Sequence, residues 1–175
     1  MATTIEMKTF FAERTHFHIS HVHANLLLLQ GYRGLAFEVL QERGLAHDHT
    51  KFTEENLEPY TWLSWWHKCR ISGTPISYPE GVEEKVKRAV HSHLHSEPHH
   101  LEYFSSPDEM TLLDLAEMVC DWTAIQEEYG RSSAKEWANA EIGRKFMFNE
   151  ENARLIHEII DELDSRKASQ AASSH

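Results

Sequence analysis

DEMTLLDLAEMVCDWTAIQEEY, residues 108–129, is apolar on nearly every side when it is wound at 3.6 residues a turn. One side of such a helix carries Leu112, Leu115, Ala116, Val119 and Trp122. The other side carries Met110, Leu113, Met118 and Ile125. The pattern predicts a helix whose residues belong to the core on both sides.

Three carboxylates interrupt this apolar surface. Asp114, Glu117 and Asp121 follow one another at i, i+3 and i+7, which places them on one face of the helix. The face is either the solvated one, continued by Glu128, or it points inward. Because like charges repel at this spacing, an inward stripe needs a cation or several hydrogen-bond donors.

The rest of the chain also reads as helical. Apolar residues recur at helical spacing over 13–42, with Gly31 and Gly34 as break points. A helix starts after Thr53, a loop rich in Pro and Gly covers 71–81, and Ser133 and Asn149 are candidate N-caps. Further helices are expected over 82–96, 133–146 and 150–166. No run alternates with period two, so we expect a compact all-α bundle of about six helices.

A chain of 175 residues predicts one domain, over residues 1–166. The last residues, 167–175, are small and polar, so we expect a disordered tail. The two cysteines are too few and too far apart in the sequence to suggest a disulfide framework. This cysteine usage suits a reducing cytosol. No signal peptide or apolar run of about 20 residues is found. We therefore expect a cytoplasmic protein that does not bind membranes; a homodimer is left open.

The net charge of the chain limits the kinds of molecule that it is expected to bind. The net charge is −11, and no basic stripe suited to a nucleic-acid duplex is visible. A small anionic substrate is compatible with this balance if a bound cation reverses the local field.

Histidines fall where core residues are expected. In HFHISHVHANLLLL, residues 16–29, His18 shares a face with Val22, Asn25 and Leu29, and His21 lies on the edge of that face. His93 continues the apolar stripe of the helix over 82–96. His99 and His100 follow Pro98, so these imidazoles can converge. Each is either a hydrogen-bonded core residue or a ligand.

LAHDHTKF, residues 45–52, adds an adjacent His47 and Asp48. Imidazole and carboxylate together suit Fe, Mn, Zn, Co or Ni, whereas Mg or Ca prefer oxygen ligands. Lys51 could reach a substrate phosphate, and His49 is expected to face solvent. The segment PYTWLSWWHKC, residues 59–69, is interpreted as core or as a base-stacking wall, and Cys120 as buried packing.

The ordered set HISHV, HDHTKF, HH and EMVCDW resembles the HD-domain superfamily of helical, metal-dependent phosphohydrolases over residues 15–125. It looks most like an uncharacterised branch, a domain of unknown function from bacteria and phages. Thr50 stands where the superfamily usually has Gly. The resemblance implies an HD-like bundle with one metal ion held by His18, His47, Asp48 and Asp121.

The resemblance also implies roles for the other residues. His93, His99 and His100 would bind a second ion or the substrate. Asp48 would bridge metals or orient a water, Lys51 would neutralise the leaving phosphate, and Glu117 would act as general base or hold a ligand in place. The expected activity is hydrolysis of a small phosphomonoester, such as a nucleoside monophosphate, by a metal-activated water. The alternatives are a di-iron oxygenase and a non-catalytic module stabilised by metal.

Overall fold

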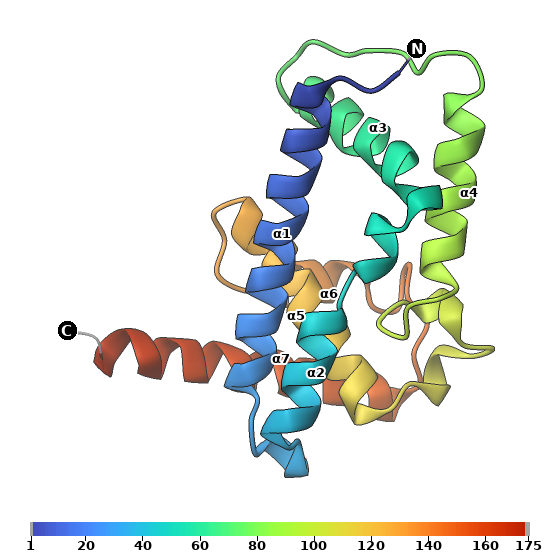
Figure 1. The fold of residues 1–175 in the computed structure, drawn as a ribbon. Coiled ribbons are helices and arrows are strands. Elements are labelled where there is room, and N and C mark those ends of the chain that lie inside the picture. The colour runs from blue at the N-terminus through green and yellow to red at the C-terminus, as the bar shows by residue number, and fades with distance from the viewer. Residues whose placement is uncertain (1, 174–175) are drawn as a thin grey trace. The chain divides into compact units, whose positions relative to one another are not determined.

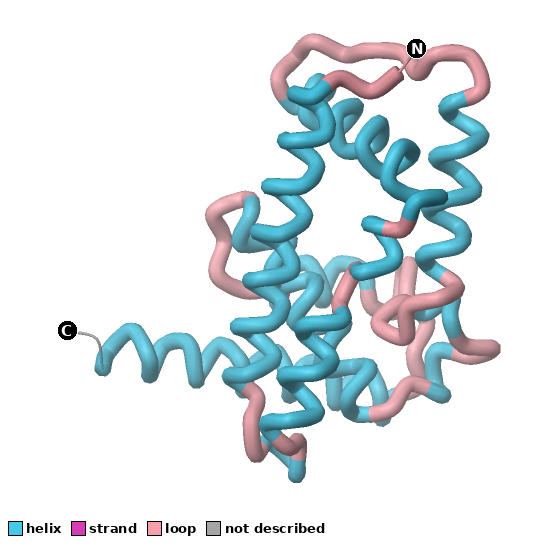
Figure 2. The backbone as a smooth tube through the Cα atoms, in the orientation of Figure 1, coloured by secondary structure: helices cyan, strands magenta, loops and turns pink. Residues whose placement is uncertain are grey.

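The structure, a computed structural model, describes residues 2–173. Within them it has seven α-helices and four short 3-10 segments. Figure 2 shows helices and loops only, and the one β-type contact in this part of the chain is a bridge between Ile142 and Phe146. The predicted all-α class is confirmed.

The described chain divides into two compact units, and it passes from one to the other at three places. Unit 1 comprises residues 2–17 and 48–97, and unit 2 comprises residues 18–47 and 98–173. The prediction of one domain over 1–166 stays a prediction, and each unit is described here by itself.

Unit 1 contains the first part of α1 (Ile5–Leu28) together with α3 (Glu54–Ile71) and α4 (Val82–Leu94). Helices α3 and α4 lie side by side (Figure 1). The short segment η2 (His49–Phe52) leads into α3. The core is built from Met7, Phe11, Tyr60, Trp62, Val82, Val86 and Ala89. Burial of Tyr60 and Trp62 agrees with the core interpretation of the aromatic segment.

Unit 2 contains the second part of α1 with α2 (Phe37–Ala46), α5 (Leu112–Glu128), α6 (Lys135–Glu141) and α7 (Glu150–Ser173). Helix α5 packs against α2 and α7 (Figure 1). The fully buried residues of its core include Leu26, Leu115, Met118, Ile156 and Ile159. Cys120 is buried among them, as interpreted from the sequence, and this burial raises the pKa of its thiol.

The helix ends follow from local chemistry. Thr111 caps α5 in a capping box, because its hydroxyl accepts from the Asp114 N–H while Asp114 accepts from the Thr111 N–H. Asn149 caps α7 as predicted, since its Oδ1 accepts from the Asn152 N–H at 2.7 Å. Gly31, in the predicted break, has φ of +78°, a conformation that glycine adopts at little cost.

Several predicted boundaries were wrong. The helix predicted over 133–146 spans only Lys135–Glu141, and its N-cap is Ala134 rather than Ser133. Helix α1 begins at Ile5 rather than near residue 13, because Met7 and Phe11 at i and i+4 are both buried and extend its apolar face. The predicted disordered tail over 167–175 is also corrected, since α7 continues to Ser173. Lys, Gln and Ala in this segment are good helix formers, so a small polar composition does not end the helix. Residues 174–175 lie outside the described residues.

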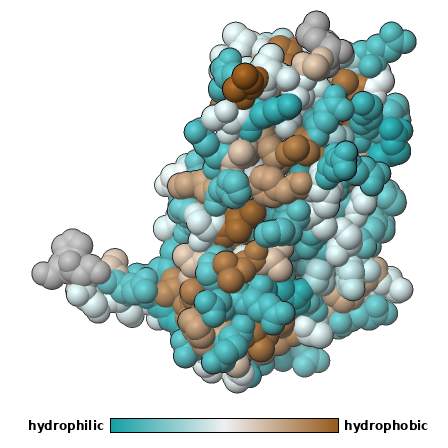
Figure 3. All heavy atoms as spheres, viewed as in Figure 1, coloured by the Kyte–Doolittle hydropathy of each residue, from teal (hydrophilic) through white to brown (hydrophobic). Residues whose placement is uncertain are grey.

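Figure 3 shows one face of the molecule, on which hydrophobic groups alternate with hydrophilic ones. Exposed large apolar side chains include Ile5, Leu45, Ile71 and Met147. Over the part of the chain that the structure describes, none of the helices combines the length and the apolar character that crossing a membrane requires.

Gly44 marks a close approach of α2 to α1. A Cβ at this position would lie 2.7 Å from His23 Cδ2 and 2.9 Å from the His23 Cα. We expect Gly44→Ala to lower the free energy of unfolding by roughly 1–3 kcal/mol, because the backbone of α1 must move. Urea unfolding measures this change. Replacing Gly by Ala in a helix otherwise stabilises it by up to about 1 kcal/mol, so an increase in stability would contradict the close contact.

Candidate metal centre

Three atoms of the types that can ligate a metal converge inside unit 2. His18 lies on α1, His47 directly follows α2, and Asp121 lies in the middle of α5. His18 Nε2 is 2.9 Å from Asp121 Oδ1, His47 Nε2 is 3.4 Å from His18 Nε2, and His47 Nε2 is 3.7 Å from Asp121 Oδ1. All three side chains are buried, with relative exposures of 7%, 1% and 9% in this order. The inward reading of the carboxylate stripe is therefore the one that the structure supports.

The three atoms fit a transition-metal ion in both chemistry and spacing. Two imidazole nitrogens and one carboxylate oxygen are a common donor set for Zn or Fe, with one or more positions left for water or substrate. Metal–ligand bonds of about 2.0–2.1 Å place tetrahedral ligand atoms about 3.3 Å apart. The observed separations of 2.9, 3.4 and 3.7 Å lie around this value. His18, His47 and Asp121 could therefore hold one ion.

A buried carboxylate orients the His47 ring. His47 Nδ1 is 2.8 Å from Glu117 Oε1, so its N–H donates to Glu117 and the lone pair of Nε2 points toward His18. Glu117 lies one helical turn before Asp121 and is only 1% exposed. Such a carboxylate on the far nitrogen fixes the tautomer and raises the basicity of a metal-binding histidine.

Arg43 holds Glu117 in turn. Its Nε is 3.2 Å from Glu117 Oε2, and its Nη2 donates to Asp114 Oδ1. Asp114 also forms the capping box of α5 with Thr111. The Arg43 guanidinium therefore joins the end of α2 to the start of α5. His18 has a similar neighbour, because its Nδ1 is 3.4 Å from Glu128 Oε1.

The electrostatics keep these carboxylates ionised. Burial alone would raise the pKa of Glu117, but hydrogen bonds from His47 and His99 lower it to about 2. Burial also opposes ionisation of Asp121, and the hydrogen bonds from His18 and His47 nevertheless hold its pKa well below the ordinary value. Negative charge at the centre is thus available to a cation.

His99 and His100 continue the imidazole cluster of unit 2. The ring centroids of His47 and His99 are 4.3 Å apart, and those of His99 and His100 are 4.1 Å apart. His99 Nδ1 is 3.3 Å from Glu117 Oε1. His99 is fully buried and His100 is partly buried. The predicted convergence is seen for these two residues, and their roles as ligands or substrate contacts stay predictions.

Asp48, Lys51 and His93 form a polar group within unit 1, in which Asp48 and His93 are buried and Lys51 is partly exposed. Lys51 Nζ donates to Asp48 Oδ2 at 2.5 Å, and His93 Nε2 is 3.2 Å from Asp48 Oδ1. Thr50 Oγ1 is 2.7 Å from His93 Nδ1. Asp48 has φ of +60°, which is uncommon outside glycine and turns its carboxylate toward Lys51 and His93. His49, the predicted solvent-facing residue, is exposed.

The sequence reasoning thus predicted His18, His47, Asp121 and Glu117, which unit 2 brings together. It left His18 and His21 as alternatives, and the structure separates them. It missed Arg43, and it considered Glu128 only as the continuation of a solvated face. Arg43 precedes His47 by four residues on α2, so helical spacing could have indicated it.

His21 belongs instead to a network around Glu127. His21 Nδ1 is 2.7 Å from Glu127 Oε2, Asn25 Nδ2 donates to the same oxygen at 3.3 Å, and Lys167 Nζ donates to Oε1. The bonds to Lys167 and His21 outweigh burial and lower the pKa of Glu127. The network joins α1, α5 and α7.

We expect this network to make the stability of the protein depend on pH. A lowered carboxyl pKa stabilises the fold above the unfolded-state value, about 4.3, and this contribution is lost as pH falls through the folded pKa. The free energy of unfolding of the native protein should therefore fall more steeply from about pH 5 to pH 3 than that of Glu127→Gln. Urea unfolding across this range measures both slopes, and equal slopes would contradict the role of Glu127.

Comparison with known proteins finds a match to the family model DUF5662, described as a family of unknown function, over residues 7–162. No curated protein and no solved structure matches the chain.

Proposed function

The chain belongs to the DUF5662 family, whose function is unknown, and from its own geometry we propose that it is a metal-dependent phosphohydrolase. The observation that carries the proposal is the convergence of His18 Nε2, His47 Nε2 and Asp121 Oδ1 within 4.8 Å of one another. The proposed cofactor is a divalent ion of Fe, Mn, Zn, Co or Ni. The resemblance of the sequence to HD-domain hydrolases supports the reaction class.

Such an ion, when bound, polarises a phosphoryl oxygen and lowers the pKa of a coordinated water toward about 7. The side chains of unit 2 prepare the site for it. Glu117 keeps the proton of His47 on Nδ1, so that Nε2 offers a lone pair. Asp121 supplies negative charge and a third donor atom. Three ligands leave at least one position for water or a phosphoryl oxygen.

Glu117 serves as a positioning residue in this proposal rather than as a general base. Its Oε1 is engaged by His47 and His99, and its Oε2 lies 3.2 Å from Arg43 Nε. A carboxylate with both oxygens held in this way is poorly placed to take a proton from water. The roles predicted for Asp48, Lys51 and His93, which belong to unit 1, stay predictions.

The proposed substrate is a small phosphomonoester, since a cation within an acidic protein attracts a compact anion. The test is phosphate release from a panel of nucleoside monophosphates and sugar phosphates by protein loaded in turn with Mn²⁺, Fe²⁺, Co²⁺, Ni²⁺ or Zn²⁺. Release that depends on the metal and disappears in Asp121→Ala supports the proposal. No release with any of these ions, from protein shown to contain bound metal, would refute it.

The same donor set favours a second candidate. Two histidines and one carboxylate with open positions are the ligands of many non-haem iron oxygenases. Oxygen uptake by the Fe²⁺-loaded protein, absent from the Zn²⁺-loaded form, would support an oxygenase and replace the hydrolase. A metal site without either activity would leave the third alternative, a binding module stabilised by metal.

A further inference from the structure

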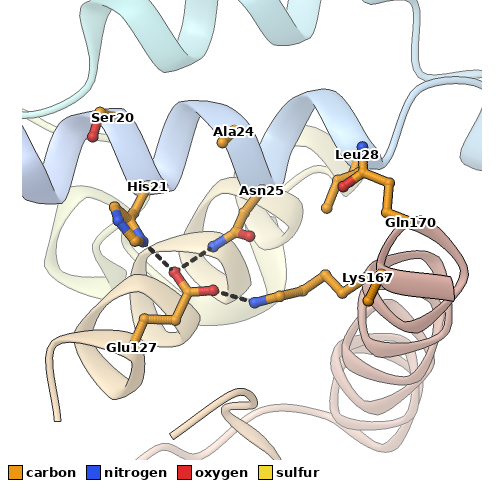
Figure 4. A pocket seen from close by; sticks show the side chains of 9 residues that line it. Ser20, His21, Ala24, Asn25, Leu28, Glu127, Lys167 and Gln170 are labelled. Atoms are coloured by element: carbon orange, nitrogen blue, oxygen red, sulfur yellow. Dashed lines mark hydrogen bonds and ion pairs between the residues drawn. The ribbon is translucent and has the colours of Figure 1, made fainter. Parts of the chain in front are cut away.

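A cavity of about 660 Å³ opens in unit 2 among side chains of α1, α5 and α7 (Figure 4). Its size lies within the range of small-molecule sites, about 300–1,000 Å³. Apolar surface comes from Ala24, Leu28 and Ala171. The polar lining comes from Ser20, His21, Asn25, Glu127, Lys167 and Gln170.

The formal charges of this cavity are paired with each other. Glu127 accepts hydrogen bonds from Lys167 and Asn25 and lies 2.7 Å from His21 Nδ1, as the dashed lines in Figure 4 show. Lys167 is the lining cation and Glu127 the lining anion, so they cancel. A phosphate bound here would be attracted by the ammonium but repelled by the carboxylate. An uncharged polar group is not repelled by the carboxylate and can hydrogen-bond beside the ion pair.

Hydrogen-bonding capacity of both kinds remains beside this ion pair. Lys167 Nζ donates to Glu127 and to the Ser132 carbonyl at 3.2 Å, which leaves one of its three N–H groups. Asn25 is only 4% exposed, and its amide oxygen has no protein partner among the described residues. Figure 4 shows this oxygen on the side of the amide that faces away from Glu127. A donor and an acceptor together suit hydroxyl groups, which need both.

The cavity and the candidate metal centre are built on the same two helices, α1 and α5. His21 follows His18 by three residues on α1, a rise of about 4.5 Å. Glu127 precedes Glu128, whose Oε1 lies 3.4 Å from His18 Nδ1. One small molecule could therefore place one end at the metal centre and the other in the cavity.

We propose that this cavity binds the uncharged, hydroxyl-bearing part of the phosphomonoester, a pentose or hexose ring, with its phosphate at the metal centre. Lys167 donates to one sugar oxygen and Asn25 Oδ1 accepts from a sugar hydroxyl. Ala24 and Leu28 contact the apolar face of the ring. This inference rests on the proposed function and specifies its substrate class as sugar phosphates.

The test is a binding measurement with two phosphonates that cannot be hydrolysed. One is the methylene phosphonate analogue of ribose 5-phosphate, and the other is benzylphosphonate, which carries no hydroxyl on its organic part. We expect the metal-loaded protein to bind the ribose compound at least about tenfold more tightly than benzylphosphonate. A difference of this size corresponds to one hydrogen bond to a charged group. Ligand-detected NMR titration gives both dissociation constants.

Lys167→Met and Asn25→Leu should each reduce this preference for the ribose compound over benzylphosphonate to about threefold or less. Lys135→Met is the matched control, because Lys135 pairs with the exposed Asp161 and does not line the cavity. The control should retain the full preference. Equal binding of both phosphonates to the native protein, or a preference that both cavity variants retain, would overturn the proposal.

Hydrolysis is measured separately, so the two proposals can fail independently. Preferential binding of the ribose phosphonate without phosphate release from any ester would refute the hydrolase and leave the cavity as a sugar site. Phosphate release without any preference for the ribose compound would support the hydrolase and refute the sugar site.

Discussion

Asp121→Ala is expected to purify without the metal that the native protein retains. The substitution removes one of three donor atoms and the negative charge that lies 2.9 Å from His18 Nε2. Loss of a residue that only supports a ligand lowers metal affinity about 10- to 100-fold, so loss of a ligand should lower it by more than about 100-fold. Plasma mass spectrometry on protein without a histidine tag measures the metal content.

His49→Ala is the control for this experiment, because His49 is an exposed histidine next to the His47–Asp48 pair. It should retain the native metal content. A native protein that takes up none of the five ions, or an Asp121→Ala variant with unchanged content, would contradict the assignment of Asp121.

Glu117→Ala is expected to have the largest effect on stability. The buried carboxylate accepts from His47 and forms an ion pair with Arg43, and its removal leaves both side chains without this partner inside unit 2. Breaking a buried ionic network by removing one partner costs about 3–5 kcal/mol. Urea unfolding of the metal-free protein should show a loss of this size.

Glu117→Gln separates positioning from folding. The amide oxygen can still accept from His47, so the variant should fold, but it lacks the charge that raises the basicity of the ring. Its metal affinity should fall about 10- to 100-fold. A competition titration with a chelator measures this change. Native affinity in Glu117→Gln would show that Glu117 does not support His47 as a ligand.

Residues of the candidate site could be predicted because two local patterns include them. One is the series of carboxylates in α5, and the other is the set of histidines on the apolar face of α1. The carboxylates of α5 recur at helical spacing in an apolar helix, and this left only a choice between solvent and an inward face. The structure resolves that choice, since Asp114, Glu117 and Asp121 are all buried. The donors that stabilise these buried carboxylates lie far away in the sequence. Arg43, for example, precedes Asp114 by 71 residues. The periodicity of α5 alone does not indicate which residue of another helix will pair with its carboxylates.

The choice between His18 and His21 shows the same limit. Both lie near one face of α1, three residues apart, and helical spacing cannot rank them. The opposing helix does so, because Asp121 contacts His18 while Glu127 contacts His21. The start of α1 and the end of α7 were misjudged for two different reasons. The start of α1 depends on the burial of Met7, which is a matter of packing against other segments. The end of α7 follows from the favourable helix propensity of residues 167–173, which outweighs their small and polar character.

Anomalous diffraction from crystals of the metal-loaded protein tests the metal centre most directly. We expect a single strong anomalous peak at about 2.0–2.2 Å from His18 Nε2, His47 Nε2 and an Asp121 carboxylate oxygen. A peak that lacks any of these three ligands, or fully loaded protein whose ion is held elsewhere on the chain, would contradict this expectation.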